Sequence, residues 1–205
     1  MAHGKLFVIS GPSGAGKGTI CKEILEEAEN MKLSVSMTTR RPREGEIDGV
    51  HYHFVDVDTF RRLIAEDGFM EYANVYGDNF YGTPKKQVLD WMEQGTNVIL
   101  EIDVQGALQI KKTYPEGVFI FILPPSLETL RERIQGRGSE TDESMARRLA
   151  EALKEISCIG EYDYHVVNED LQEAVERLRA IVLAEGCKLD NEEAGRIVKR
   201  YKEDL

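Results

Sequence analysis

The sequence has few cysteines, no long apolar run, and fewer basic than acidic residues. Its cysteines, Cys21, Cys158 and Cys187, are odd in number, far apart and in no paired motif. A disulfide framework or a zinc site is therefore not expected. No apolar run approaches the roughly 20 residues that span a bilayer, and the first residues lack the apolar core of a signal peptide. These absences favour a protein of the reducing cytoplasm that makes no membrane contact.

The excess of negative charge argues against two classes of binding partner. The chain has 37 Asp and Glu residues against 26 Lys and Arg, a net charge of −11. Nucleic acid and acidic membrane surfaces attract basic proteins, so neither is expected as a partner. Affinity for a phosphate group must then come from locally placed cations. With 205 residues, one substantial core with subdomains is expected rather than two full domains.

One short stretch has the pattern of a phosphate-binding loop. It follows the apolar run Lys5 to Ser10, typical of a buried parallel strand, and precedes Ile20 and Ile24 at helical spacing. Glycines let successive N–H groups converge on an anion, the helix start adds its positive dipole end, and Lys17 supplies a full charge. We interpret the stretch as a nucleotide-binding P-loop; a glycine-rich turn that only packs strand on helix is the alternative. The loop consists of Gly11, Pro12, Ser13, Gly14, Ala15, Gly16, Lys17, Gly18 and Thr19.

The remaining segments alternate between strand and helix patterns, which predicts an α/β fold. A parallel sheet of about five strands, flanked by helices, should bind its ligand at the carboxyl ends of the strands, where the P-loop lies. The further strands of this sheet are expected at Leu33–Thr39, Asn97–Ile102, Val118–Leu123 and Tyr164–Asn168.

Residues 39–90 interrupt this alternation and are expected to form an insertion with a small mixed sheet. His51 to Val55 and Phe69 to Val75 have strand patterns, and a turn is expected from Tyr76 to Gly82. Thr83 and Pro84 then have the pattern of a helix cap and first-turn proline. His51 and His53 could share one face of a strand, but no third ligand accompanies them, so ordinary strand side chains are favoured over a metal site.

The chain is thus predicted to be a single domain with four parts. The core comprises residues 1–38, 91–132 and 150–186, and the insertion comprises 39–90. A short lid is expected at 133–149, and residues 187–205 form a helical extension. In the extension, Ala194, Ile197, Val198 and Tyr201 recur at helical spacing. They predict an amphipathic helix that docks on the core or on another subunit; a monomer and a homo-oligomer both remain open.

The predicted lid is rich in arginine. Arg137 lies between two glycines, as a cation on a closing lid over phosphates requires, and Arg133 and Arg148 lie nearby. Arg147 has an equally good interpretation as part of a solvated helix face. No pair of nucleophile and base is recognisable. Phosphoryl transfer to another phosphate needs none, because the accepting oxygen is already an anion, and this is consistent with a nucleoside monophosphate kinase.

Several motifs, in order and spacing, make the chain resemble a guanylate kinase from residue 4 to about 186. They are Ser10 to Lys17, Ser34 to Arg43, Gly49 to Phe54, Tyr81 to Thr83, Glu101 to Gly106, and Gly136 to Gly138. The resemblance implies transfer of phosphate from ATP to GMP, and to dGMP, with Mg²⁺, and it makes the insertion the GMP-binding subdomain. A non-catalytic binding module for a phosphorylated partner and a related kinase with another small acceptor are the alternatives.

The resemblance also implies roles for individual residues. It places Ser36, Arg40, Arg43, Tyr52 and Tyr81 around the GMP phosphate, and Glu71, Thr83 and Asp103 around guanine. It places Lys17, Arg133, Arg137 and Arg148 around the transferred phosphate, with Arg137 also binding ATP and Asn168 near adenine. Gly18 stands where a Ser or Thr hydroxyl usually helps to hold magnesium. The resemblance therefore implies a metal held mostly by nucleotide phosphates and water, with no certain protein ligand.

Base selectivity has a simple physical interpretation. Guanine presents N1–H and the 2-amino group as donors to a carboxylate such as that of Glu71, and a hydroxyl such as that of Thr83 donates to O6. Adenine would leave a buried carboxylate unpaired. The alternatives are structural: Thr83 as a helix cap, Tyr52 as packing, and Asp103 as a partner of magnesium-bound water.

Overall fold

The computed structural model describes residues 3–75, 79–135, 142–189 and 191–203. Its centre is a five-stranded sheet in the order β2-β7-β1-β8-β9, in which each neighbouring pair is parallel. The strands are β1 (Leu6–Ser10), β2 (Met31–Leu33), β7 (Asn97–Glu101), β8 (Val118–Leu123) and β9 (Tyr164–Val167). The predicted α/β fold is confirmed.

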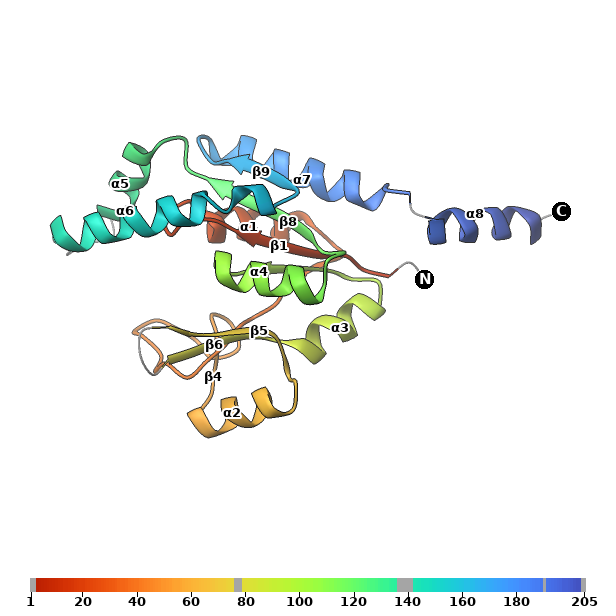
Figure 1. The fold of residues 1–205 in the computed structure, drawn as a ribbon. Helices are drawn as coiled ribbons and strands as arrows, with labels where there is room; N and C mark the ends of the chain where they lie inside the picture. The colour runs from red at the N-terminus through yellow and green to blue at the C-terminus, as the bar shows by residue number, and fades with distance from the viewer. Residues whose placement is uncertain (1–2, 76–78, 136–141, 190, 204–205) are drawn as a thin grey trace.

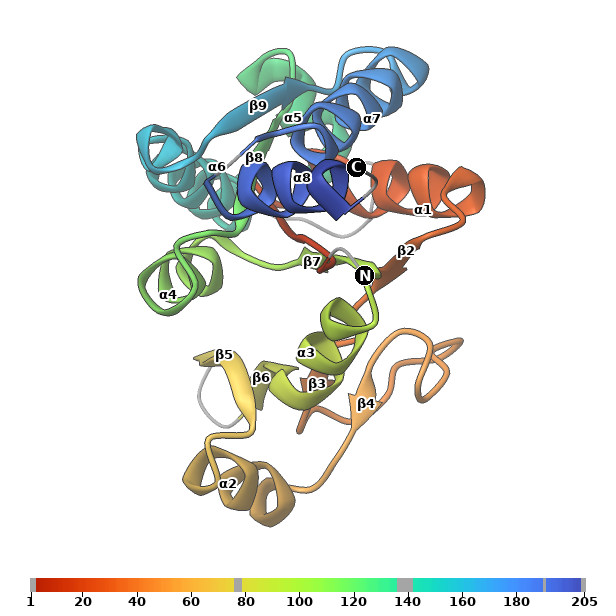
Figure 2. The ribbon, with the colours of Figure 1, turned by 90° about the vertical axis from the view of Figure 1, so that its right-hand side faces the viewer.

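Helices cover both faces of this sheet, which explains why its central strand is buried throughout. Phe7 and Ile9 of β1 belong to the core on one face, and Leu6 and Val8 to the core on the other. The first face carries α1 (Lys17–Glu27) and α7 (Leu171–Gly186); the second carries α3 (Lys85–Glu93) and α4 (Val104–Thr113). Figures 1 and 2 show the sheet between these two layers. Because β1 is held from both sides, the loop at its carboxyl end starts from a rigid support.

A second, smaller sheet forms a separate layer beyond α4 (Figure 1). Its order is β4-β3-β6-β5, with β3 and β4 parallel and the other pairs antiparallel. The strands are β3 (Met37–Thr38), β4 (His53–Phe54), β5 (Phe69–Val75) and β6 (Asn79–Pro84). The helix α2 (Val57–Ala65) places Phe60 against Phe69 and Phe80, with ring centroids 4.3 and 5.4 Å apart. The predicted mixed sheet is therefore present and has its own aromatic core.

Two predictions at the edges of this sheet are wrong. Leu33–Thr39 is not one strand: β2 ends at Leu33, and β3 begins at Met37 in the other sheet. The turn predicted to reach Gly82 is also too long, since β6 begins at Asn79. Both errors arise because pairing partners that are distant in sequence decide where each strand lies: Met37 pairs with Gly82.

The start of α3 also differs from its prediction. Thr83 lies in β6, Pro84 occupies the N-cap position, and the helix begins at Lys85. Pairing of Pro84 with Phe69 continues the sheet to this point. Thr83 is therefore not the helix cap.

The predicted lid, residues 133–149, includes the end of α5 (Leu127–Gln135) and the first part of α6 (Asp142–Ile156), and these two helices share a small apolar cluster. Ser126 caps α5, since its Oγ accepts a hydrogen bond from the N–H of Thr129 at 3.0 Å. The tip with Gly136, Arg137 and Gly138 lies outside the described residues. A 3₁₀ turn (Ile159–Glu161) connects α6 to β9.

The last helix, α8 (Asn191–Glu203), projects away from both sheets, beyond the end of α7 (Figure 1). Val198 and Tyr201 are 51% and 64% exposed. The predicted helix is present, but docking on the core is wrong, because the chain leaves α7 in the direction away from the sheet. Docking on another subunit stays a prediction. In the described part of the chain, none of the helices combines the length and apolar character needed to cross a membrane.

Candidate active site

A cavity of about 600 Å³ lies where the carboxyl edge of the parallel sheet faces the second sheet. Lys17 and Asp103 line it from the parallel-sheet side, and Glu71 and Tyr81 line it from the second sheet. The structure thus brings together, in one cavity, residues from the two groups that the sequence analysis assigned to ATP and GMP.

The glycine-rich loop offers main-chain groups to an anion. Gly14 and Gly16 have φ values of +95° and +91°, which other residues rarely adopt. Gly16 is also the N-cap residue of α1, which has no side-chain cap and no acidic residue in its first turn. The N–H groups at the start of α1 therefore remain available to a bound anion, in the positive end of the helix dipole.

Lys17 is held inside this loop. Its Nζ donates hydrogen bonds to the carbonyl oxygens of Gly11 and Pro12, at 2.6 and 3.3 Å. Burial lowers the pKa of Lys17, and the nearby carboxylate of Glu101 opposes that shift. A phosphate group in the loop would oppose it further, because a second negative charge stabilises the ammonium form.

Two carboxylates in the cavity, Glu101 and Glu155, were not assigned from the sequence. Burial raises the pKa of both, and the positive charge of Lys17 opposes the shift in each case. Glu101 could have been found, since it ends a parallel strand at the edge where ligands bind. Glu155 gave no such signal, because only the packing of α6 brings it to the cavity.

Carboxylates of the cavity, Glu101 among them, lie where a magnesium ion could bind with the nucleotide. A Cβ added at Gly18 would lie 3.4 Å from Oε1 of Glu101, so position 18 faces this carboxylate. In the described ranges, no cluster of three His, Cys, Asp or Glu residues could hold a metal by itself. The residues present fit a magnesium ion carried by nucleotide phosphates and water, with Glu101 and Asp103 as partners for the bound water.

His51 and His53 contribute no metal site among the residues described. Nδ1 of His51 accepts a hydrogen bond from the N–H of Ile47 at 3.0 Å, which commits that nitrogen to the backbone.

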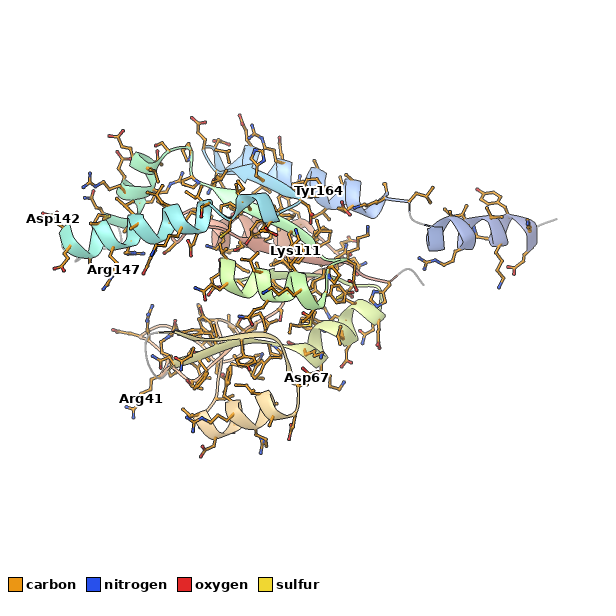
Figure 3. All side chains as sticks on the ribbon, viewed as in Figure 1. Arg41, Asp67, Lys111, Asp142, Arg147 and Tyr164 are labelled. Atoms are coloured by element: carbon orange, nitrogen blue, oxygen red, sulfur yellow. The ribbon has the colours of Figure 1, made fainter. Side chains whose placement is uncertain are left out.

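Two arginines of α5 and α6 contact the loop region. Nη2 of Arg148 donates to Oγ of Ser13 at 3.0 Å, and Nη2 of Arg133 donates to the carbonyl oxygen of Asn168 at 2.9 Å. Nη1 of Arg133 is buried, and no described group accepts a hydrogen bond from it. Arg147, labelled in Figure 3, is exposed on α6, as its solvated-face interpretation expects. Arg137 lies outside the described residues.

Asn168 lies behind the loop. It is 7% exposed, and its Nδ2 donates a hydrogen bond to the carbonyl oxygen of Ala15 at 2.8 Å. Asn168 is not one of the described residues that line the cavity.

On the opposite wall, Glu71 is a buried carboxylate with one neutral partner. It is 8% exposed, and the hydroxyl of Thr83 donates to its Oε1 at 2.7 Å. Burial raises the pKa of Glu71 to about 7, the charge of Asp103 adds to the shift, and the Thr83 hydrogen bond opposes it. Asp103 is itself the N-cap of α4, since Oδ1 accepts from the N–H of Gly106 at 2.8 Å.

Hydrogen bonds within the protein hold the guanidinium of Arg40. Its Nη1 and Nη2 donate to the two carboxylate oxygens of Glu46, at 2.8 and 2.9 Å, and its Nε donates to the hydroxyl of Tyr81 at 3.1 Å. The hydrogen bond with Glu46 raises the pKa of Arg40, and in return lowers the pKa of Glu46 to about 2. The sequence analysis missed Glu46, whose role becomes visible only when the loop folds back on Arg40.

The remaining predicted residues of this wall differ in position. Ser36 and Tyr52 line the cavity. Tyr52 also packs under Arg40 and edge-on against Tyr81, so its structural and ligand-facing interpretations are compatible. Arg43 is exposed, and its main-chain N–H donates to Glu46 at 2.6 Å.

Comparisons of the sequence and of the fold with known proteins give one consistent result. A family model described as guanylate kinase matches residues 3–185. A guanylate kinase of Clostridium acetobutylicum is 57% identical over 91% of this chain and 88% of the relative. One of Clostridioides difficile is 50% identical over 98% of both chains. The crystal structure of guanylate kinase from Anaplasma phagocytophilum superposes with a TM-score of 0.75 at 39% identity, covering 91% of this chain and 88% of that one.

Proposed function

This chain belongs to the guanylate kinase family, and we propose that it transfers the terminal phosphoryl group of ATP to GMP inside the cavity between its two sheets. The single observation that carries the proposal is that a phosphate-binding loop and a buried carboxylate able to accept from guanine line the same cavity. Enzyme function follows from the relatives at 50–57% identity.

The donor side binds ATP through residues 11–19. The main-chain N–H groups of this loop surround the β- and γ-phosphates, and Lys17 exchanges its carbonyl partners for phosphate oxygens. Arg133 and Arg148 approach from α5 and α6, and Arg137 is assigned to the same phosphate groups. The buried Nη1 of Arg133 supports this assignment, because an unpaired buried guanidinium nitrogen requires an acceptor that a phosphate oxygen would provide.

The acceptor side binds GMP through the second sheet. Glu71 accepts from N1–H and the 2-amino group of guanine, with Thr83 and Asp103 beside it. Arg40, Arg43, Ser36, Tyr52 and Tyr81 surround the phosphate. The support for Arg40 is its fixed orientation, since a guanidinium already held by Glu46 and Tyr81 loses little side-chain entropy on binding.

The reaction then needs alignment and charge neutralisation, not a base. The phosphate oxygen of GMP attacks the γ-phosphorus of ATP in line with the leaving ADP oxygen, and the P–O bond to ADP breaks as the new bond forms. Bound magnesium would neutralise part of the phosphate charge. Lys17 and the arginines stabilise the charge that spreads over the transferred group.

We further propose the setting of this reaction. The substrates are ATP and GMP, with dGMP as a second acceptor, and the enzyme acts in the cytoplasm. The part with the second sheet is the GMP-binding subdomain, and residues 133–149 act as the lid. A non-catalytic binding module is not favoured, because an intact Lys17 loop serves no purpose in a cleft that only holds a phosphorylated partner.

The test is formation of ADP from ATP and Mg²⁺ with GMP, dGMP, AMP, UMP or CMP offered separately. Turnover confined to GMP and dGMP is expected. Comparable turnover with AMP would remove the guanine assignment of Glu71. No turnover with any acceptor, in protein shown by circular dichroism to be folded, would reject the enzyme and favour the binding module.

A further inference from the structure

Gly106 occupies a helical position at which the helix itself gains nothing from a glycine. Asp103 is the N-cap of α4, so Gly106 is the third residue of the helix, and it is buried. Only proline is less favourable than glycine inside a helix, and Glu or Gln is the preferred residue three positions after an N-cap. The reason for a glycine at this position must therefore lie in a neighbouring element.

The neighbour is the side chain of Glu71. A Cβ added at Gly106 would lie 2.9 Å from Oε2, 3.2 Å from Cδ and 3.4 Å from Cγ of Glu71, and these are the three atoms nearest to it. Non-bonded heavy atoms prefer separations of about 3.5 to 4.0 Å, so the added carbon would overlap the carboxylate. The carboxylate of Glu71 thus fills the space that a side chain at position 106 would need.

Glu71 is also held from its other side. Its Oε1 accepts a hydrogen bond from the hydroxyl of Thr83 at 2.7 Å, on the paired strand β6. Met70, the preceding residue of β5, packs against the core cluster that includes Ala107 of α4, and the two elements lie in contact (Figure 1). One carboxylate oxygen therefore meets Thr83, and the other lies against Gly106.

From this fit we propose that Gly106 is a positioning residue for base specificity: its missing side chain lets the carboxylate of Glu71 take the position from which it accepts both guanine donors. This inference deepens the proposed function and rests on it. Two parallel hydrogen bonds to one carboxylate require both oxygens to be in place to within tenths of an ångström. A methyl group at position 106 would displace Oε2 first, because that oxygen is the nearest atom.

The test is Gly106→Ala, which adds one methyl group. Titration calorimetry with GMP and with ATP and Mg²⁺ compares this variant with the natural protein. The affinity for GMP should fall roughly 5- to 50-fold, while the affinity for ATP stays constant. In steady-state assays the KM for GMP should rise and that for ATP should not. The melting temperature should change little, since the better helix propensity of alanine offsets the adjustment of Glu71.

The ratio of the affinities for GMP and IMP reports the geometry of the carboxylate more directly. Hypoxanthine, the base of IMP, keeps N1–H but lacks the 2-amino group, so it makes only one of the two hydrogen bonds to Glu71. The natural protein should prefer GMP by about tenfold or more. Gly106→Ala should reduce this preference, because a displaced carboxylate no longer accepts from both donors.

A double variant shows whether Gly106 acts through Glu71. In Glu71→Ala there is no carboxylate to displace, so the addition of Gly106→Ala should leave kcat/KM for GMP at the value of Glu71→Ala alone. The double variant also serves if Gly106→Ala does not fold, since removal of the Glu71 side chain relieves the overlap.

Gly195→Ala, in α8, is the matched control. It makes the same exchange inside a helix, but a Cβ at Gly195 would meet nothing within 4 Å. The affinities for GMP and ATP should both stay at the values of the natural protein.

Four results would overturn the inference. They are an unchanged GMP affinity in Gly106→Ala, an equal loss of affinity for GMP and ATP, a further loss of kcat/KM when Gly106→Ala is added to Glu71→Ala, and a double variant that does not fold. Failure of the proposed function is a separate outcome, because it is seen in the natural protein alone: no binding of GMP there would reject the proposed function before any variant is compared.

Discussion

The two walls of the cavity are built in different ways. The ATP wall consists mainly of one short stretch, Gly11 to Thr19, of which seven of the nine residues line the cavity. The GMP wall consists of side chains from separate segments: Ser36 from the crossing between the sheets, Tyr52 from the loop before β4, Glu71 from β5, and Tyr81 from β6.

This difference has consequences for charge and for selectivity. Main-chain N–H groups do not titrate and do not distinguish one nucleotide from another, so the ATP wall recognises phosphate. A carboxylate whose pKa is raised to about 7 titrates near neutral pH, so if Glu71 accepts from guanine as proposed, the GMP wall should recognise a base and respond to pH. The predictions below test whether the walls act separately.

The largest effect is expected on the ATP wall, from Lys17→Ala. Removing the charge that faces the transferred phosphoryl group should lower kcat by at least about 10²- to 10³-fold, while the fold stays intact. Steady-state kinetics and circular dichroism measure the two quantities. Lys22→Ala, on the exposed face of the same helix, is the control and should be nearly neutral. Near-normal turnover of Lys17→Ala would remove the loop from the mechanism.

On the GMP wall, Glu71→Gln should weaken GMP binding roughly 10- to 100-fold and leave ATP binding unchanged. An amide keeps the size of the side chain and can still accept from Thr83, but it cannot accept two hydrogen bonds from guanine as a carboxylate does. Titration calorimetry with each nucleotide measures the affinities for GMP and for ATP separately. Equal losses for GMP and ATP would mean that Glu71 is structural, and Glu66→Gln at the exposed end of α2 controls for a change of charge alone.

Lowering the pH should also weaken the binding of GMP selectively. Because the pKa of Glu71 is raised to about 7, its carboxyl is ionised above that pH and protonated below it, and the protonated form is a poor acceptor for guanine. The dissociation constant of GMP should therefore rise about tenfold per pH unit below 7. The phosphate of GMP titrates as well, so the difference between the natural protein and Glu71→Gln isolates the carboxyl. Parallel pH profiles for the two proteins would refute the assignment.

The smallest effect concerns magnesium on the ATP wall. Gly18→Ser should lower the Mg²⁺ concentration at half-maximal rate by about two- to fivefold, since the added hydroxyl provides one oxygen near Glu101. Gly18→Ala has the same bulk without the oxygen and should show no gain. An equal response of Gly18→Ser and Gly18→Ala would show that position 18 does not contribute to magnesium binding.

The ATP wall could be predicted from the chain alone because its information is local. A strand, a glycine-rich turn and a helix start follow one another within about 20 residues, and each carries its own pattern of side chains. The same reasoning predicted the α/β class and located four of the five parallel strands, β1, β7, β8 and β9, since buried strands between helices have few alternative arrangements.

Local pattern failed where a segment depends on a distant partner. Leu33 to Thr39 has one apolar pattern, but pairing with β7 holds its first residue and pairing with β6 holds Met37 and Thr38. Thr83 has the pattern of a helix cap, yet pairing of β6 with β5 keeps it in a strand. There its hydroxyl donates a hydrogen bond to Glu71.

Tertiary structure also decided which polar groups meet. Glu46 on Arg40, Glu155 beside Lys17 and Asn168 on Ala15 are contacts between side chains and groups whose positions depend on how whole elements pack. A hydrogen bond depends on tenths of an ångström and on direction, whereas a sequence pattern records only residue type and spacing. The residue types needed for phosphate and guanine binding could therefore be recognised in the chain, while the contacts that orient them had to come from the fold.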